Sequence, residues 1–136
     1  MTKQASGTFE VDLNPQPFWD EATSPPLSRL SLDKQFSGDL QGSSKGEMLS
    51  TQSENSAGYV ALENVTGELS GRKGSFVLQH SGTMTRGEGT LSVTVVPGSG
   101  TGELVGLEGK MSIEGSGGEH RYMLEYSFAE KNEATR

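Results

Sequence analysis

Cysteine is absent from the 136 residues, which excludes a disulfide framework, a zinc ribbon and a catalytic thiol. No apolar run approaches the roughly 20 residues that a membrane helix needs, and the chain does not start with an apolar leader. Basic residues are also few: 11 against 18 acidic residues give a formal net charge of −7. That charge disfavours nucleic acids and anionic membranes as partners. We therefore expect a soluble, cytoplasmic protein that binds neither.

A sustained helical stripe is missing as well. Apolar and polar residues alternate instead, which is the period of half-buried strands. Glycine is abundant, with 19 residues or about 14%, twice its average usage, and it supplies turns between the runs. This pattern predicts one all-β domain over residues 1–136, ordered over 5–130, as an eight-stranded antiparallel β-barrel; a barrel is preferred to a sandwich because closure removes exposed edges. The eight runs are 8–13, 29–36, 46–49, 59–65, 75–83, 90–96, 110–114 and 121–128.

Residues 14–27 break this rhythm, because they hold four of the five prolines and the only tryptophan, Trp19. Proline lacks the N–H donor that a central strand needs, so a long loop is predicted. Two interpretations stay open. The segment is a lid or binding loop over a cavity, or it is a surface loop whose Phe18 and Trp19 plug one end of the barrel.

Two familiar motifs give no functional assignment. The glycine-rich run 98–102 is followed by neither the lysine nor the helix of a phosphate-binding loop, so it is interpreted as a turn. The two histidines, His80 and His120, have no metal-ligand spacing, and neither a metal site nor a cofactor is expected. His80 shares a strand face with Phe76 and Leu78, which is typical of a hydrogen-bonded histidine at the edge of an apolar face.

Carboxylates on the strand faces are the more informative candidates. Glu10 and Asp12 share one face of the first run, Asp33 lies on the polar face of the second, and Tyr59 and Glu63 share a face of the fourth. The ordinary rule sends these polar faces to water. The inverse arrangement keeps them in the lumen of an oligomeric barrel, where carboxylates with raised pKa values serve as general acid or base. Under the ordinary rule the core contains Phe9, Val11, Leu13, Leu30, Leu32, Val60 and Leu62.

Several stretches resemble known barrels. Residues 90–109 (TLSVTVVPGSGTGELVGLEG) resemble the glycine-rich turn of allene oxide cyclase and dirigent-type barrels, and 56–65 look like a strand of that cyclase. Nearly the whole chain, with 29–48 and 71–86 the most specific, is similar to a bacterial domain-of-unknown-function family of allene-oxide-cyclase-like barrels. The resemblance implies an eight-stranded antiparallel barrel with a central cavity, assembled as a homo-oligomer, either a dimer or a trimer.

The same resemblance implies which residues line the lumen. The plant cyclase closes a ring on a fatty-acid epoxide with a carboxylate and polar neighbours, and its lumen positions match Glu10, Asp12, Asp33 and Tyr59. Only the glutamate is retained, since two asparagines have become aspartates and a cysteine has become Tyr59. Oxylipin cyclisation is therefore not implied, but a polar-lined cavity is, with Glu63 further along the face of Tyr59.

Three functions follow for this barrel. The first is binding of a small hydrophobic or amphipathic ligand in a polar-lined central cavity, with Trp19 in the gating segment. The second is a cofactor-free isomerase or cyclase-like enzyme in which Glu10 acts as general base or stabilises positive charge, oriented by Asp12 and Asp33. The third is a structural or stress-related oligomer with a filled barrel. Fold-level analogy alone is a weak basis for choosing among them.

Overall fold

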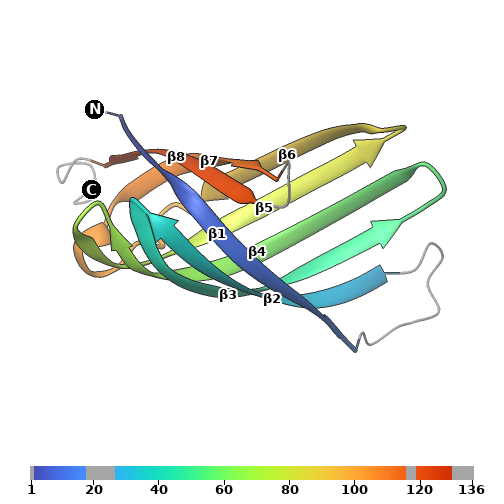
Figure 1. Cartoon of the computed structure of the whole chain (residues 1–136), viewed down its shortest axis with the longest axis horizontal. Coiled ribbons are helices and arrows are strands. Elements are labelled where there is room, and N and C mark those ends of the chain that lie inside the picture. Colours follow the sequence, from blue (N-terminus) through green and yellow to red (C-terminus); the bar gives the residue numbers. More distant parts are fainter. Residues whose placement is uncertain (1, 18–26, 116–118, 130–136) are drawn as a thin grey trace.

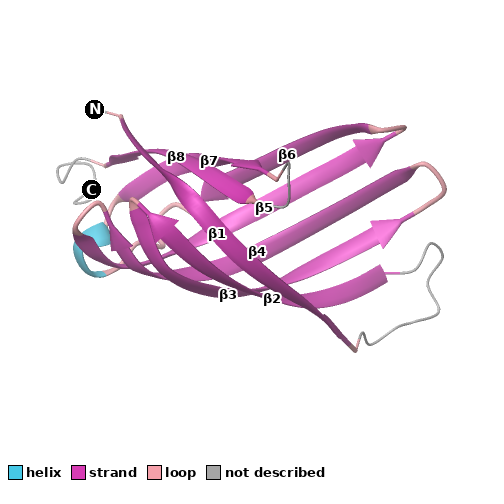
Figure 2. Cartoon of the chain, viewed as in Figure 1, coloured by secondary structure: helices cyan, strands magenta, loops and turns pink. Residues whose placement is uncertain are grey.

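The computed structural model describes residues 2–17, 27–115 and 119–129, which form an all-β structure (Figures 1 and 2). Each strand pairs with the next along the chain and the last pairs with the first, so the sheet closes into one antiparallel barrel. The predicted eight-stranded antiparallel β-barrel is confirmed. The strands are β1 (Lys3–Gln16), β2 (Leu27–Gly38), β3 (Leu40–Gln52), β4 (Ser56–Leu69), β5 (Arg72–Thr85), β6 (Glu88–Val95), β7 (Leu107–Glu114) and β8 (His120–Phe128).

Most strands are longer than the alternation predicted. The short run 46–49 belongs to β3, whose first half contains Gly42 and two serines and therefore lacks an apolar signal. β1 continues through Pro15 to Gln16, so the connection to β2 begins later than predicted. Proline is tolerated there because β1 pairs with β8 only up to Phe9 and is an edge beyond that point. Residues 18–26, including Trp19, lie outside the described residues.

On β1 the apolar face points into the barrel, as the ordinary rule for strands predicts. On β4 the face that contains Tyr59 and Glu63 points inward instead. Phe9 is buried, whereas Val60 and Leu62 are 54% and 55% exposed, so the prediction that these two belong to the core is wrong. Val65 and Leu69 decide the orientation of β4, because both are fully buried in the core. Side chains alternate strictly along a strand, so the even-numbered residues 60 and 62 must face outward.

The predicted core residue Leu13 is also 48% exposed, for a different reason. It pairs with Leu32 on the inner face, but it lies beyond the end of the β1–β8 ladder at Phe9. The strands β6–β8 have 8 or 9 residues, against 12 to 14 in β1–β5. One wall of the barrel is therefore short.

This difference in strand length gives the barrel two unlike ends. One end is filled by a cluster of aliphatic and aromatic side chains from all eight strands. At the other end, where the β3–β4 and β5–β6 hairpins lie on the right of Figure 1, the inner face of β3–β5 is left partly uncovered. Backbone pairing between β6 and β7 is limited to one pair of residues, Thr94 with Lys110. No helix among the described residues is long and apolar enough to cross a membrane.

Candidate functional site

The open end contains a cavity of about 740 Å³. Its walls come from the ends of β3–β6 and from Ser28 of β2, and cross-strand pairing joins Ser50, Tyr59, Gly82 and Leu91 into one row on the inner face. We call this cavity the mouth. Its apolar side chains include Met84 and Leu91, which stay 51% and 46% exposed because no strand covers them. An apolar surface is thus accessible to a ligand from solvent.

Tyr59 is the polar centre of the mouth. Its ring lies against Gly82, where an added Cβ would sit 2.6 Å from the ring carbon Cε1. Burial raises the pKa of the Tyr59 hydroxyl, and the charge of Glu63 raises it further. The phenol therefore keeps its proton at neutral pH. It forms no hydrogen bond with any residue that the structure describes and is not fully enclosed, so it is available to a ligand.

A buried polar cluster lies below the mouth. Relative to the row of Tyr59, His80 is one row and Glu63 two rows deeper in the barrel. Glu63 is fully buried, and its carboxylate is the hub of the cluster. Its Oε1 lies 2.9 Å from Lys34 Nζ and 2.5 Å from His80 Nε2, and its Oε2 accepts a hydrogen bond from Ser44 Oγ at 2.5 Å. Four successive strands, β2 to β5, thereby contribute one side chain each.

Glycine on β3 makes this cluster possible. Lys34 on β2 must reach Glu63 across β3, and Gly46 is the residue that faces Glu63 there. A Cβ at position 46 would lie 2.8 Å from Glu63 Cβ and 2.2 Å from the carbonyl oxygen of Leu62. Real side chains do not tolerate such distances. Gly46 therefore provides the space in which the lysine and the glutamate meet.

The cluster fixes the charge of Glu63. Burial by itself would raise the pKa of the carboxyl, but the His80 hydrogen bond, the Lys34 charge and the Ser44 hydrogen bond outweigh it and lower the pKa to about 2. An ionised carboxylate only accepts hydrogen bonds, so His80 Nε2 and Ser44 Oγ are the donors. Lys34 Nζ also lies 4.7 Å from the centre of the Phe9 ring, within cation–π range. A carboxylate with so low a pKa is a weak general base.

The structure separates the sequence-predicted candidates. Tyr59 and Glu63 lie inside the barrel at successive depths, and the carboxylate of Glu63 is close enough to perturb Tyr59. Glu10 and Asp12 are exposed on the outer face of β1. Asp33 is also on the outer face, with Oδ1 3.9 Å from Lys45 Nζ. The register puts Phe9 and Val11 on the inner face of β1, so the residues between them point outward.

Sequence reasoning did not select Lys34 and Ser44. The signal for Lys34 was present, because it follows Leu30 and Leu32 and precedes Phe36 on the apolar face of its strand. A lysine in that pattern indicates a buried cation, and a buried cation needs a partner. Ser44 gave no signal, since its stretch of β3 has no apolar alternation.

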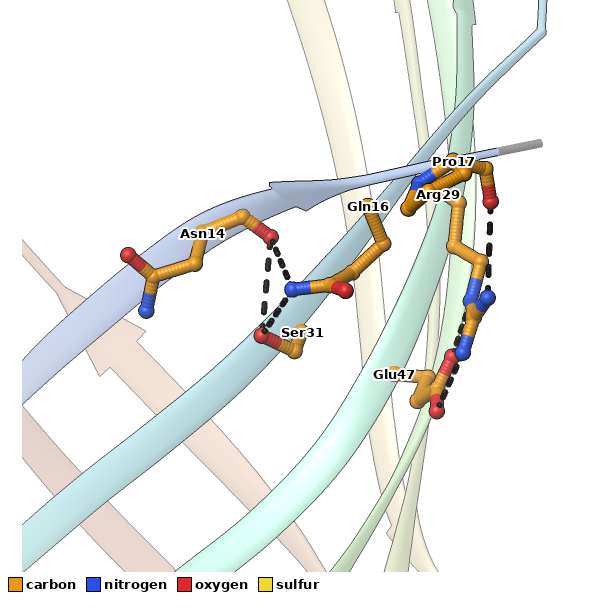
Figure 3. A network of polar contacts seen from close by, with 6 residues as sticks. All are labelled: Asn14, Gln16, Pro17, Arg29, Ser31 and Glu47. Atoms are coloured by element: carbon orange, nitrogen blue, oxygen red, sulfur yellow. Dashed lines mark hydrogen bonds and ion pairs between the residues drawn. The ribbon is translucent and has the colours of Figure 1, made fainter.

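A second, larger hollow of about 1130 Å³ lies on the outer face of β3–β5. Arg29 and Glu47 form a bidentate ion pair at its edge, with Nε–Oε1 and Nη2–Oε2 distances of 2.5 and 2.9 Å (Figure 3). Arg29 Nη1 also donates to the Pro17 carbonyl at 3.4 Å, and Gln16 Nε2 donates to Ser31 Oγ at 3.2 Å. These outer contacts tie the end of β1 to β2 and β3. The polar groups in these outer contacts satisfy each other, whereas the Tyr59 hydroxyl of the mouth has no hydrogen-bond partner among the described residues.

Metal binding has no obvious location in the described ranges, where no group of three or more His, Cys, Asp or Glu side chains is placed to hold an ion. The mouth and the cluster beneath it contain hydroxyl groups, one amide, thioethers, aliphatic side chains, the His80 imidazole and the ion pair of Lys34 with Glu63.

The family model of DUF3224, described as a protein of unknown function, matches residues 5–126. The chain belongs to this family. A solved structure of a DUF3224 protein of unknown function from Shewanella oneidensis MR-1 is 45% identical, with a TM-score of 0.89. The alignment covers 96% of this chain and 100% of that one. None of the curated proteins compared with the chain gives a significant match.

Proposed function

We propose that this DUF3224 protein binds a small hydrophobic or amphipathic molecule in the mouth of its barrel. The observation that carries the proposal is the cavity of about 740 Å³ on the inner face, which combines exposed apolar side chains with a Tyr59 hydroxyl that has no hydrogen-bond partner among the described residues. Small-molecule sites are typically concave and apolar, with volumes of about 300–1,000 Å³ and a few polar groups that orient the ligand. The mouth has each of these properties.

A matched pair of substitutions tests this location. Leu91 and Leu62 are 46% and 55% exposed, but Leu91 lines the mouth and Leu62 lines the outer hollow. Both changes, Leu91→Ser and Leu62→Ser, remove the same apolar side chain from a half-exposed position, so their effects on folding are similar. They differ in the hollow that they alter.

The measurement is native mass spectrometry of the purified protein, followed by denaturing release of bound molecules and by titration with Nile red, an uncharged dye that fluoresces in apolar surroundings. We expect wild type and Leu62→Ser to bind the dye and Leu91→Ser to bind it several-fold more weakly. If Leu62→Ser loses binding and Leu91→Ser keeps it, the site is on the outer face. If wild type binds nothing, the proposed function is wrong.

Three sequence-based expectations stay predictions that accompany this proposal. They are the resemblance to allene-oxide-cyclase barrels, which implies a cavity; the cytoplasmic location; and assembly into a homo-oligomer. The native mass measured in the same experiment gives the number of chains in the assembly.

A further inference from the structure

The mouth is uncharged, although the chain is not. Of the residues that the structure describes, those lining the mouth include no Asp, Glu, Lys, Arg or His, and their polar groups are hydroxyls, the Gln52 amide and backbone. The chain as a whole has 18 acidic and 11 basic residues. Glu54 and Arg86 line an adjoining hollow that shares Gln52, Ser53, Ala57 and Met84 with the mouth, so these two opposite charges lie beside the mouth and not in its wall.

The buried charges beneath the mouth cancel each other. Lys34 Nζ lies 2.9 Å from Glu63 Oε1, and both side chains are almost fully buried. Ser44 Oγ and His80 Nε2 also donate to the same carboxylate. The Lys34 ammonium is thus committed to an anion already within the protein, and it offers no free positive charge to an anionic ligand.

This arrangement discriminates between ligand head groups. A carboxylate or phosphate that enters the mouth loses water and meets no cationic side chain among the described residues that line it, which is costly in a low-dielectric site. The net charge of −7 adds a repulsive field. Removing water from a carbonyl, ester or alcohol costs less free energy, because these groups carry no charge. The Tyr59 hydroxyl, which is protonated and has no hydrogen-bond partner among the described residues, can replace one of their hydrogen bonds to water.

We propose that the ligand of the mouth is an uncharged amphipathic molecule, with an apolar body against Met48, Met84 and Leu91 and a carbonyl or hydroxyl head at Tyr59. This inference rests on the proposed function, because it names the chemical class that the mouth accepts. It excludes free fatty acids and phosphate esters as preferred ligands.

The test is displacement of Nile red at neutral pH by two probes that differ in one charge, decanoate and methyl decanoate. We expect the ester to displace the dye at a concentration at least about tenfold lower, since an unpaired buried charge costs more than the roughly 1.4 kcal/mol that a tenfold difference represents. Tyr59→Phe should weaken displacement by the ester, because the ester carbonyl then loses the phenol as a donor.

A charge introduced into the mouth should reverse the preference. Met84 is 51% exposed, so Met84→Lys is tolerated and supplies the missing cation. We expect it to bind decanoate more tightly than the wild type does. Leu62→Lys places the same charge on the outer face and serves as the control.

The outcomes separate this inference from the proposed function. Equal displacement by both probes, stronger displacement by decanoate, or displacement by neither while the dye binds would overturn the inference and leave the mouth as a binding site. Failure of Nile red to bind the wild type would overturn both. An unchanged preference in Met84→Lys would show that charge in the mouth does not decide selectivity.

Discussion

Glu63 should make the stability of this barrel depend on pH in a way that one substitution removes. Its pKa is lowered from the ordinary value of 4.5 to about 2, because the contacts with His80, Lys34 and Ser44 outweigh burial. A group whose pKa is lowered in the folded state stabilises it above the unfolded pKa. That stabilisation is lost as the pH falls from 4.5 towards 2.

The magnitude follows from the two pKa values. A difference of about 2.5 corresponds to about 3 kcal/mol, at about 1.4 kcal/mol for each pH unit. Between pH 7 and pH 3, about 2 kcal/mol of this is lost, since the unfolded chain is protonated at pH 3 while most folded molecules still hold the carboxylate. Glu63→Gln removes this dependence. It also leaves Lys34 buried without its partner, which costs about 3–5 kcal/mol and leaves a typical domain still folded.

The assay is urea unfolding followed by circular dichroism at pH 7 and pH 3, on either side of the pI of about 4.8. Wild type should lose about 2 kcal/mol more than Glu63→Gln between the two pH values, while the other carboxylates contribute equally to both proteins. Glu10→Gln is the control, because Glu10 is exposed on the outer face, and it should behave as wild type. If Glu63→Gln shows the full wild-type pH dependence, the carboxylate is not held ionised by the cluster.

Three further substitutions test the packing around the site. Lys34→Met combined with Glu63→Leu should be as stable as wild type or more so, because apolar residues often replace a buried ion pair without loss; stability as low as that of Glu63→Gln would contradict this. Gly82→Ala should push the Tyr59 ring into the mouth, because a Cβ there would lie 2.6 Å from Tyr59 Cε1, so weaker Nile red binding is expected and unchanged affinity would refute this displacement of the ring. Tyr122→Phe removes a hydroxyl that accepts from a buried backbone N–H at 2.9 Å and should cost about 1–3 kcal/mol in urea unfolding; a loss well below this would mean that the bond contributes little.

The fold could be predicted because each strand carries local information. Alternation marked all eight strands, and glycine and proline marked most of the turns between them. β3 was the weakest prediction, because Gly42, Ser43, Ser44 and Gly46 interrupt its pattern. The two glycines are required by their neighbours, since a Cβ at Gly42 or at Gly46 would lie 2.2 Å from a carbonyl oxygen of β4. The reason for the irregular sequence of β3 therefore lies in another strand.

The site was only half predictable for the same reason. Tyr59 and Glu63 share a face with Ala61, but alternation within β4 cannot say whether that face is inside. Val65 and Leu69, further along the strand, settle the question by being buried in the closed end. The partnership of Lys34 with Glu63 joins residues 29 positions apart on non-adjacent strands, and no local pattern contains it.

The position of the ion pair links stability to the proposed function. A buried pair contributes less to folding than well-packed apolar side chains of similar size, so stability alone does not account for Lys34 and Glu63. The pair lies between the apolar cluster of the closed end and the mouth, where the barrel wall becomes incomplete. There it supplies a polar floor with no net charge. A single lysine would have attracted anions and a single glutamate would have repelled them, whereas the pair leaves Tyr59 to orient an uncharged head group.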